Sequence, residues 1–525
     1  MTRHRIAFTT ALAGIVGAAT LALAPIGARA QDAGTTENGL TLYKQECETC
    51  HGVTGKGDGP ASYLLFPKPR DFTKGSFKVR TTGTGQLPTD ADLQRTLELG
   101  FPGSGMPNFA HVSEADRSEI IDVVKSFLPE GRQQTDEIVE PPEPSASTEA
   151  LVAQGAQVYT MMGCDRCHGP EGRADGPASA TLKDEWGNAA RANDFTRGIY
   201  KGGATDQDVY LRFITGMMGT PMPSYGGIMT DEQAYALVHY VKSLAGDIEA
   251  AVQPKHEALT AVRVPGAVPV DPKDSVWVDA PESNLPVMLL HQRQDVIRNL
   301  RVKAAHNGAD VAICLEWDDP TPDMSILRHE DFSDAVAVQF ALGDDTTVET
   351  LTMGIAQSPI NIWHWQAARQ MDVERYRDVE TVYPGMVSDD YPWSDTAFPN
   401  QPESGAAESI PTPSEYETTF ITALAAGNPV SKPEGVRAVH EFNAAGFGSL
   451  TSQPETAQSV RGVGVWDNGV WKVVVVRRMK STDKRDAHFQ AGDSIALAFA
   501  VWDGSHGDRN GQKAVTNWNT LTLAR

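Results

Sequence analysis

The chain has little positive charge and few cysteines for its length. Its 525 residues include 45 Lys and Arg against 68 Asp and Glu, which gives a net charge of −23. A surface this acidic repels polyanions, so nucleic acids and anionic lipid surfaces are not expected partners. With only five cysteines, the chain also cannot be one of the small disulfide-rich scaffolds.

Long apolar runs are absent from residues 31–525. No stretch there approaches the roughly 20 apolar residues of a membrane span. We therefore expect no membrane span in the mature chain. The first thirty residues differ from the rest of the chain. Arg3 and Arg5 precede an apolar run from Ile6 to Ile26, and Ala28-Arg29-Ala30 is an A-x-A cleavage site. Residues 1–30 are predicted to be a signal peptide cleaved near Ala30, which implies a periplasmic protein.

Four of the five cysteines lie in one motif that occurs twice, Cys-x-x-Cys-His-Gly. Its copies contain Cys47, Cys50 and His51, and Cys164, Cys167 and His168. Cys-x-x-Cys-His is the attachment signature of a c-type haem, in which the thiols form thioethers to the porphyrin and the histidine binds iron. A zinc site or a redox dithiol could use the same thiols, but no second Cys-x-x-Cys stands nearby to complete a zinc tetrad. The motifs therefore predict two covalent haems c in an electron-transfer protein.

The two motifs belong to a longer internal repeat. Asp58-Gly-Pro-Ala-Ser62 recurs as Asp175-Gly-Pro-Ala-Ser179, at the same offset as the cysteines. A repeat of this length indicates a duplicated domain. Each copy is predicted to run from a first helix through the haem motif and a long loop to a closing helix, and capping signals stand at Ser113 and Thr230. The predicted parts are domain 1 at 31–129, a Pro/Glu-rich linker at 130–148 and domain 2 at 149–246.

This plan resembles class I cytochrome c, in which the first and last helices cross beneath the haem. The resemblance covers residues 38–128 and 149–245 and implies two all-α cytochrome c domains.

The sixth iron ligand is expected in the loop before each closing helix, where Met106 and Met222 stand at matching places, each followed by proline. A thioether sulfur favours Fe(II) and raises the potential, and the proline fixes the local backbone. In the second copy other methionines remain possible ligands: Met217, Met218 and Met229. With both axial positions filled, neither iron would have room for a substrate.

The composition changes after the second repeat. Residues 247–274 are rich in Pro, Val and Ala and are predicted to be a second linker. Residues 275–525 contain short β-branched and aromatic runs separated by turn signals, which is typical of an all-β antiparallel sandwich or barrel. The runs most typical of strands are Val311–Trp317, Ala335–Phe340, Gly462–Trp466, Trp471–Val476 and Ile495–Trp502.

Three features of this β region carry further predictions. Asp467-Asn468-Gly469 between two apolar runs indicates a hairpin. The fifth cysteine, Cys314, lies in an alternating run and is expected to be a small buried side chain without chemistry. The Pro-, Asp- and Ser-rich stretch from Met371 to Val436 is predicted to be a long surface excursion.

Two segments of the β region, Met353 to Trp365 and Val501 to Trp518, resemble the haem b-binding γ subunit of ethylbenzene dehydrogenase. That family includes the γ subunits of dimethylsulfide dehydrogenase, chlorate reductase and selenate reductase. These subunits serve periplasmic molybdenum enzymes, and each binds one non-covalent haem b through Met and Lys. The resemblance covers residues 275–525, and by position it points to Met353 and Lys513 as the axial pair.

From the residues alone the haem b ligands stay open. A lysine ligates iron only as the neutral amine, so its site must lower the pKa by desolvation. Other candidates are Met324, Met386, Met479, Lys480 and Lys484. His364 lies between Trp363 and Trp365, and strand alternation places it opposite both of them, on an exposed or interface face.

These features predict an electron-transfer subunit without a catalytic site of its own. Haem b would exchange electrons with a molybdenum/iron–sulfur oxidoreductase, and the haems c would connect it to a soluble or membrane-bound respiratory carrier. One alternative is a dihaem cytochrome c with a haem-free β-sandwich that serves for docking or ligand binding. Another is a haem peroxidase, which would need one five-coordinate iron.

Overall fold

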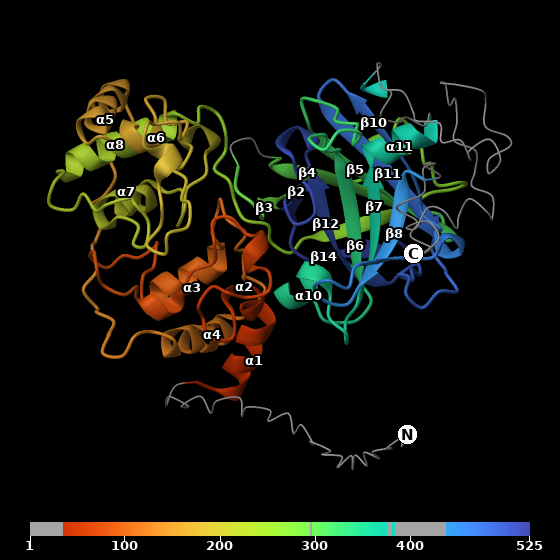
Figure 1. The fold of residues 1–525 in the computed structure, drawn as a ribbon, viewed down its shortest axis with the longest axis horizontal. Coiled ribbons are helices and arrows are strands. Elements are labelled where there is room, and N and C mark those ends of the chain that lie inside the picture. The colour runs from red at the N-terminus through yellow and green to blue at the C-terminus, as the bar shows by residue number, and fades with distance from the viewer. Residues whose placement is uncertain (1–34, 294–296, 375–380, 384–436) are drawn as a thin grey trace, which may run out of the picture.

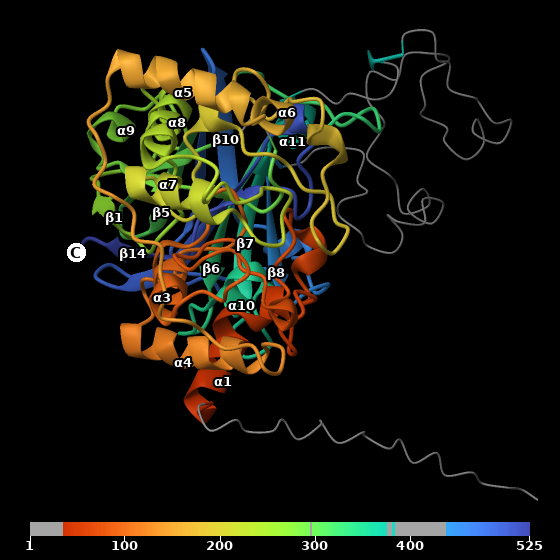
Figure 2. The same cartoon turned by 90° about the vertical axis from the view of Figure 1, so that its left-hand side faces the viewer.

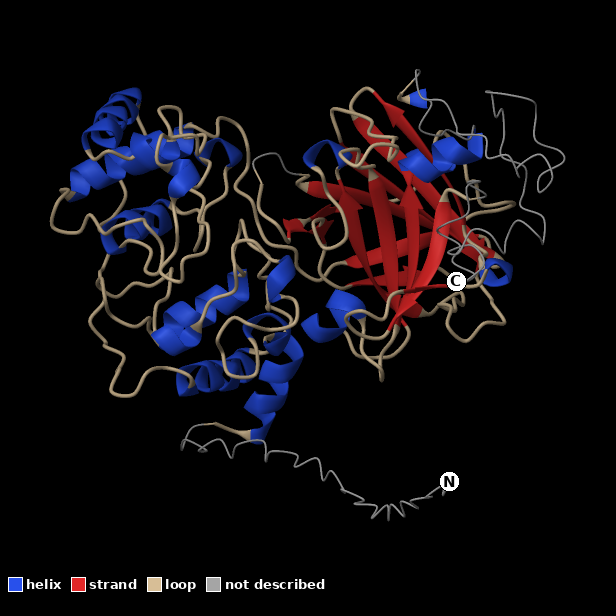
Figure 3. Ribbon diagram, in the orientation of Figure 1, coloured by secondary structure: helices blue, strands red, loops and turns tan. Residues whose placement is uncertain are grey.

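The computed structural model describes residues 35–293, 297–374, 381–383 and 437–525. Two helical modules lie beside one β domain (Figure 1), and the strands are drawn on the β side, together with a few helices (Figure 3). The predicted signal peptide and nearly all of the predicted excursion from Met371 to Val436 lie outside the described residues. Within the described ranges, none of the helices has the length and apolar character that crossing a membrane requires.

The first module consists of α1 (Glu37–Glu46), α2 (Glu48–His51), α3 (Asp90–Leu99) and α4 (Glu114–Ser126). Helices α1 and α4 approach closely at Gly39, where an added Cβ would lie 2.9 Å from the carbonyl oxygen of Glu119. One turn later, the buried Tyr43 donates its hydroxyl to the carbonyl oxygen of Gly52 at 2.8 Å. The predicted cap is confirmed, because the hydroxyl of Ser113 accepts the N–H of Asp116.

The second module repeats this plan with α5 (Glu149–Met161), α6 (Asp165–His168), α7 (Asp206–Thr215) and α8 (Asp231–Ser243). A Cβ at Gly155 would overlap the carbonyl group of Ala236 on α8. Tyr159 donates its hydroxyl to the carbonyl oxygen of Gly169 at 2.6 Å, as Tyr43 does in the first module. The predicted duplication therefore holds in the fold and in its packing details.

The two modules are fixed to each other by arginines of facing helices and loops. The Arg80 guanidinium donates to the carbonyl oxygen of Thr215 at 2.5 Å, and the Arg212 guanidinium donates to the carbonyl oxygen of Arg80 at 2.9 Å. Arg95 pairs with Asp208 at 2.7 Å. Because these contacts are partly buried and reciprocal, the modules form one unit that faces the sheet (Figure 2).

The β domain contains one 14-stranded sheet, with the order β10-β11-β5-β4-β1-β14-β12-β6-β7-β8-β9 and the short strands β2, β3 and β13 beside this path. The bounds are β1 (Ala258–Arg263), β2 (Ser283–Pro286), β3 (Met288–Leu289), β4 (Asn299–His306), β5 (Asp310–Asp318), β6 (Ala335–Ala341), β7 (Ile360–Gln366), β8 (Val439–Ala444), β9 (Thr451–Ser452), β10 (Arg461–Asp467), β11 (Val470–Arg478), β12 (Ser494–Trp502), β13 (Ala514–Val515) and β14 (Asn519–Leu523). Short helices accompany it: α9 (Val276–Asp279), α10 (Val348–Met353) and α11 (Ala367–Glu374).

Strand β1 corrects two predictions. It pairs parallel with both β14 and β4, so the sheet is mixed and not antiparallel throughout. It also lies within the segment 247–274 that was predicted to be a linker, because Leu259 and Ala261 alternate into the core over a stretch too short to stand out in the sequence. The strand path ends at β10 and β9 among the described residues, so the sheet does not close into a barrel and has the form of a sandwich.

The predicted strands and hairpin are confirmed. Asp467 pairs with Val470 across the turn, and Asn468 and Gly469 take φ values of 50° and 83°, as a type I′ turn requires. Cys314 is fully buried on β5, and burial raises the pKa of its thiol to about 12. Tryptophans fill the core between the sheet layers: Trp317, Trp363, Trp365 and Trp471.

Candidate haem-binding sites

The first module encloses a cavity lined by every residue of its predicted haem site. Cys47, Cys50, His51 and Met106 all face it, and its volume is about 150 Å³. The remaining walls are mostly apolar side chains from α3, α4 and the loops, which suits a flat hydrophobic macrocycle.

His51 is held in one orientation and one tautomer. Its Nδ1 donates to the carbonyl oxygen of Arg70 at 2.9 Å, and its ring stacks on Phe72 with centroids 4.4 Å apart. Burial lowers the pKa of His51 to about 4. The imidazole is therefore neutral with its Nδ1 protonated, which leaves the Nε2 lone pair for a metal.

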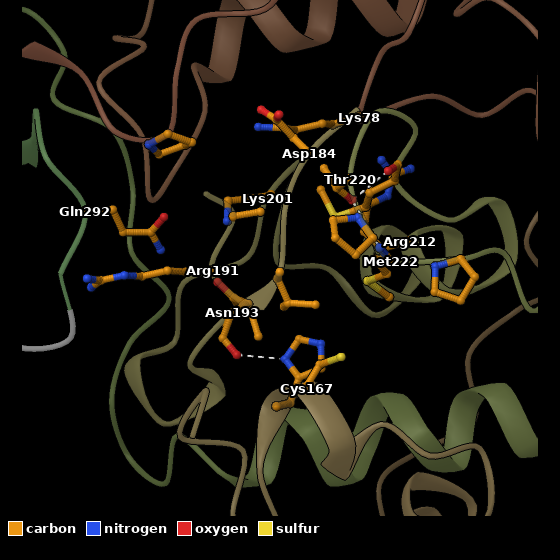
Figure 4. Close-up of a pocket in the computed structure, with 18 of the residues that line it drawn as sticks. Lys78, Cys167, Asp184, Arg191, Asn193, Lys201, Arg212, Thr220, Met222 and Gln292 are labelled. Atoms are coloured by element: carbon orange, nitrogen blue, oxygen red, sulfur yellow. Dashed lines mark hydrogen bonds between the residues drawn. The ribbon is translucent and has the colours of Figure 1, made fainter. Parts of the chain in front are cut away.

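The second module encloses the equivalent cavity, with a larger volume of about 390 Å³. Cys164, Cys167, His168 and Met222 line it (Figure 4). The Nδ1 of His168 donates to the carbonyl oxygen of Asn193 at 2.8 Å, and the ring stacks on Phe195 at 4.5 Å. Burial lowers the pKa of His168 as well.

The structure separates the methionine candidates of the second module. Met229 packs in the helical core, and neither Met229 nor Met218 lines the cavity, whereas Met217 does. The N–H of Met217 donates to the carbonyl oxygen of Met222, just as the N–H of Phe101 donates to that of Met106. Met217 therefore occupies the place of Phe101, and Met222 occupies the place of Met106.

The four motif cysteines are free thiols in this structure. Burial raises the pKa of Cys50 to about 12 and that of Cys164 to about 11. A redox dithiol needs a lowered thiol pKa, and the shifts at Cys50 and Cys164 have the opposite direction.

Gln253 is a site residue that the sequence did not indicate. It lies in the predicted second linker, yet it is buried against the first module. Its Nε2 lies 2.8, 3.0 and 2.6 Å from the carbonyl oxygens of Phe101, Ser104 and Met106. The Gln253 amide thus links three carbonyl oxygens of the loop that carries Met106. No local sequence pattern indicates a contact between segments so far apart in the chain.

Replacing Gln253 by the similarly sized methionine should loosen that loop. The carbonyl oxygen of Ser104 loses its donor, whereas those of Phe101 and Met106 keep the Ser104 hydroxyl and the Phe101 N–H. A buried unsatisfied polar group costs about 1–3 kcal/mol. In the haem-loaded protein we expect the red charge-transfer band of Met-ligated ferric haem to lose intensity from the first haem alone. Gln134→Met is the control, since Gln134 bonds the Pro88 carbonyl oxygen and lines neither cavity; an unchanged band in Gln253→Met would contradict this role.

The β domain presents the predicted haem b residues on one face of the sheet. Along β7, Trp363 and Trp365 point into the core and His364 points away from it, as predicted. His364 is half-buried on that face. It packs edge-on against Trp502 with ring centroids 5.1 Å apart, and desolvation lowers its pKa well below the ordinary value. That this face is an interface stays a prediction.

Lys513 and Met353 are also half-buried and lie by this face. The Lys513 Nζ lies 4.9 Å from the centre of the Trp502 ring, and burial lowers the pKa of the amine to about 8. Met353 ends α10 and packs in the cluster that contains Ile362 and Ala498. Because side chains alternate along strands, Ile362 shares its face with His364, and Ala498 shares its face with Trp502.

The residues present fit a haem between Met353 and Lys513. The amine is desolvated, which favours its neutral, ligating form. Buried polar atoms without a hydrogen-bond partner lie around His364: its own Nδ1, the Nδ1 of His440 and the Nη1 of Arg369. A ligand with carboxylates or other polar groups would supply the hydrogen-bond partners that these atoms lack.

The other predicted candidates are placed elsewhere. Met479 is buried inside the tryptophan core, and Met324 packs against the same core. Lys480 and Lys484 are exposed, and Met386 lies outside the described residues. Within the described part of the chain, the arrangement therefore favours Met353 and Lys513.

Comparisons with known proteins agree with this architecture. A cytochrome c family model matches residues 36–127 and 152–245, and an ethylbenzene dehydrogenase model matches residues 273–514. The gamma subunit of dimethylsulfide dehydrogenase from Rhodovulum sulfidophilum is 27% identical over 278 residues, which are 50% of this chain and 80% of that protein. Cytochrome c-554(547) of Halothiobacillus neapolitanus is 33% identical over 90 residues, which are 17% of this chain and 91% of that protein.

Among solved structures, a chain of the Kuenenia stuttgartiensis reducing HAO-like protein complex Kustc0457/Kustc0458 is 43% identical, with a TM-score of 0.39. The match covers 40% of this chain and 96% of that chain. The family matches and the duplicated helical fold lead to one conclusion: the chain belongs to the cytochrome c family through two tandem modules, which are joined to a domain of the ethylbenzene dehydrogenase family.

Proposed function

We propose that this chain is a periplasmic electron-transfer subunit with two covalent haems c and one non-covalent haem b. The observation that carries the proposal is that each helical module gathers a Cys-x-x-Cys-His motif and a methionine around one cavity. Export through the signal peptide at residues 1–30 is part of the proposal, because haem c attachment takes place outside the cytoplasm.

A histidine and a methionine of each module would hold the iron of a bound haem. Bound haem would supply one-electron chemistry between Fe(III) and Fe(II). His51 and His168 present a neutral imidazole from one side of each cavity, and Met106 and Met222 present a thioether. With a histidine and a methionine at each iron, no position would remain open for peroxidase chemistry, and the chain would act as a relay.

The order of the relay follows from shared walls. Val348, at the start of α10, lines the first haem cavity. Its N–H donates to Glu46 on α1 at 3.1 Å, which fixes α10 against the first module (Figure 1). Met353 ends the same helix about 7.5 Å further along, given a rise of about 1.5 Å per residue. The haem b site and the first haem c site are therefore neighbours.

The two haem c cavities are neighbours as well. The segment from Pro67 to Arg70 and Lys78 line both of them. Electrons would pass between haem b and the second haem c through the first haem c, without diffusional docking between these centres.

The partners proposed for the two ends differ. A molybdenum/iron–sulfur oxidoreductase would exchange electrons with haem b, by analogy with the gamma subunit of dimethylsulfide dehydrogenase. A soluble or membrane-bound respiratory carrier would meet the haem c end.

Haem counting tests the proposal. Acid–acetone extraction followed by pyridine haemochrome spectra should give one extractable protohaem and two retained haems c per chain. Two retained haems without extractable protohaem would leave a dihaem cytochrome with a haem-free β module, and would remove haem b from the relay.

Lys513→Gln should abolish the extractable haem while both haems c remain. The glutamine side chain is shorter than that of lysine and its amide is a poor iron ligand, whereas Lys513 is a half-buried, desolvated amine on this face. The control is Lys484→Gln, which changes an exposed lysine of the same domain. Equal protohaem content in both variants would exclude Lys513 as the ligand.

A further inference from the structure

Arg70 takes part in both haem c sites with different atoms. Its carbonyl oxygen accepts the Nδ1–H of His51 and so orients the imidazole of the first module. Its side chain leaves that module, because its guanidinium lies 4.4 Å from the centre of the Trp186 ring in the second module. An added Cβ at Gly219, also in the second module, would overlap the Arg70 Nη1.

The repeat shows that this crossing is not reciprocal. Asn193 is the counterpart of Arg70, because its carbonyl oxygen accepts the Nδ1–H of His168 and Asp194 follows it as Asp71 follows Arg70. The side chain of Asn193 stays within its own module and donates to the carbonyl oxygen of Ile199 at 2.7 Å. Only the first module therefore sends a charged group into its neighbour at this position.

The second cavity is strongly cationic, although the chain is acidic overall. Seven Lys and Arg residues line it against two Asp residues, while the whole chain has a net charge of −23. Figure 4 shows Lys78, Lys201, Arg191 and Arg212 around this cavity, with Asp184 among them. Burial lowers the pKa of Lys201 to about 8, because desolvation destabilises the protonated amine in this cavity.

Several polar atoms of this cavity are buried and lack a hydrogen-bond partner. They are the Arg70 Nη1, the Trp186 Nε1, and the Arg212 Nε and Nη1. All are donors and none is an acceptor, so the missing partner must be an acceptor. Guanidinium groups bind carboxylates especially well, since two parallel N–H groups match two oxygens. Asp184 and Glu185 lie near Arg70 but leave its Nη1 unpaired.

We propose that the first module completes the second haem site: the guanidinium of Arg70, together with the indole N–H of Trp186, binds a carboxylate of the second haem's propionates. This inference rests on the proposed function, because it requires haem c in the second module. The two modules then form one binding unit. In this unit the Arg70 carbonyl oxygen orients the proximal histidine of the first haem, and the Arg70 guanidinium neutralises a carboxylate of the second.

Redox titration of the full-length protein carrying its haems tests this site. A positive charge beside a haem stabilises its reduced form, since oxidation adds a positive charge to the iron. We expect Arg70→Gln to reduce the equilibrium constant for reduction of one haem c by about tenfold, which is 59 mV for a one-electron couple. The other midpoint should shift much less, because Arg70 meets the His51 site with its carbonyl oxygen, which remains.

Further variants assign the shifted midpoint to the second haem. Trp186 lines only the second cavity, so Trp186→Phe should move the same midpoint by a smaller amount. Arg70→Lys, which keeps the charge, should restore most of the potential. Arg95→Gln breaks the pair with Asp208 between the modules without touching either cavity, and should leave both midpoints unchanged.

The outcomes separate this inference from the proposed function. A protein with both haems attached overturns the inference if Arg70→Gln shifts neither midpoint. It is equally overturned if Arg70→Gln and Trp186→Phe shift different midpoints, or if Arg95→Gln reproduces the effect. A polypeptide without attached haem would instead overturn the proposed function. Should Arg70→Gln fail to fold, Trp186→Phe and Arg70→Lys still give the decisive comparison.

Discussion

Replacing Met222 by alanine is expected to lower the reduction potential of the second haem c by on the order of 0.1 V, within the span of about 0.8 V that axial ligands cover. A thioether favours Fe(II), so its loss favours the oxidised state. The same variant should lose the part of the red charge-transfer band that comes from this haem. Redox titration followed in the visible spectrum measures both effects.

Met217→Ala is the matched control for this prediction. Met217 lines the same cavity, and its N–H donates to the carbonyl oxygen of Met222. It occupies the place of Phe101 in the first module, where no sulfur is present. We expect nearly unchanged potentials in Met217→Ala, and a shift of the other midpoint in Met106→Ala. The reverse result, a large shift in Met217→Ala and none in Met222→Ala, would show that the ligand of the second module is misassigned.

Replacing Arg477 by leucine is expected to destabilise the β domain by about 3–5 kcal/mol, the cost of removing one partner from a buried ion pair. Arg477 lies 3.2 Å from Glu441 and 3.7 Å from Asp486, and all three side chains are buried. Its guanidinium also lies 4.9 Å from the centre of the Trp363 ring. Without Arg477, two carboxylates would remain in the core without their counter-ion.

This prediction has a control in the next residue. Arg478 is 75% exposed and pairs with Asp310 at 3.4 Å on the surface, where an ion pair contributes about 0–1 kcal/mol. Urea unfolding followed by tryptophan fluorescence should show a large loss for Arg477→Leu and a small one for Arg478→Leu. Equal losses would mean that the buried ion network does not stabilise the domain.

The ion network also bears on haem b. Arg477 contacts the side chain of Asn361 at 3.4 Å, and Asn361 lies on β7 directly before Ile362. The same strand carries His364 on the haem b face. We therefore expect Arg477→Leu to weaken protohaem retention as well as the fold, whereas Lys513→Gln should affect retention alone.

The haem motifs and helices could be predicted because their signals are local. Cys-x-x-Cys-His places two thiols and an imidazole within one turn, and the hydroxyl of Ser113 caps the helix that begins next to it. The glycine–tyrosine pairs, at Gly39 and Tyr43 in the first module, likewise mark the helix crossing within one turn of sequence. Such features need no knowledge of distant segments.

Other features depend on contacts between residues far apart in the chain. Gln253 binds a loop about 150 residues earlier in the sequence, as its separation from Met106 shows, and nothing beside Gln253 indicates that partner. Arg70 has an ordinary local environment in sequence, and only the packing of two modules reveals its second site. Strand β1 is short, and its parallel pairing depends on neighbours at the far end of the chain.

The haem b site is an intermediate case. The alternation of Trp363, His364 and Trp365 could be read from the sequence, but the contact of His364 with Trp502 on a distant strand could not. Met353 and Lys513 were indicated by family resemblance, and their packing contacts lie by the same face.

The mass of the exported polypeptide tests the central claim most directly. Produced in a host that matures c-type cytochromes and measured under denaturing conditions, the chain cleaved near Ala30 should be heavier than its polypeptide by two haem groups. Cys167→Ala together with Cys164→Ala should reduce that excess to one haem. A mass equal to the bare polypeptide would contradict haem attachment, and with it the relay built on both modules.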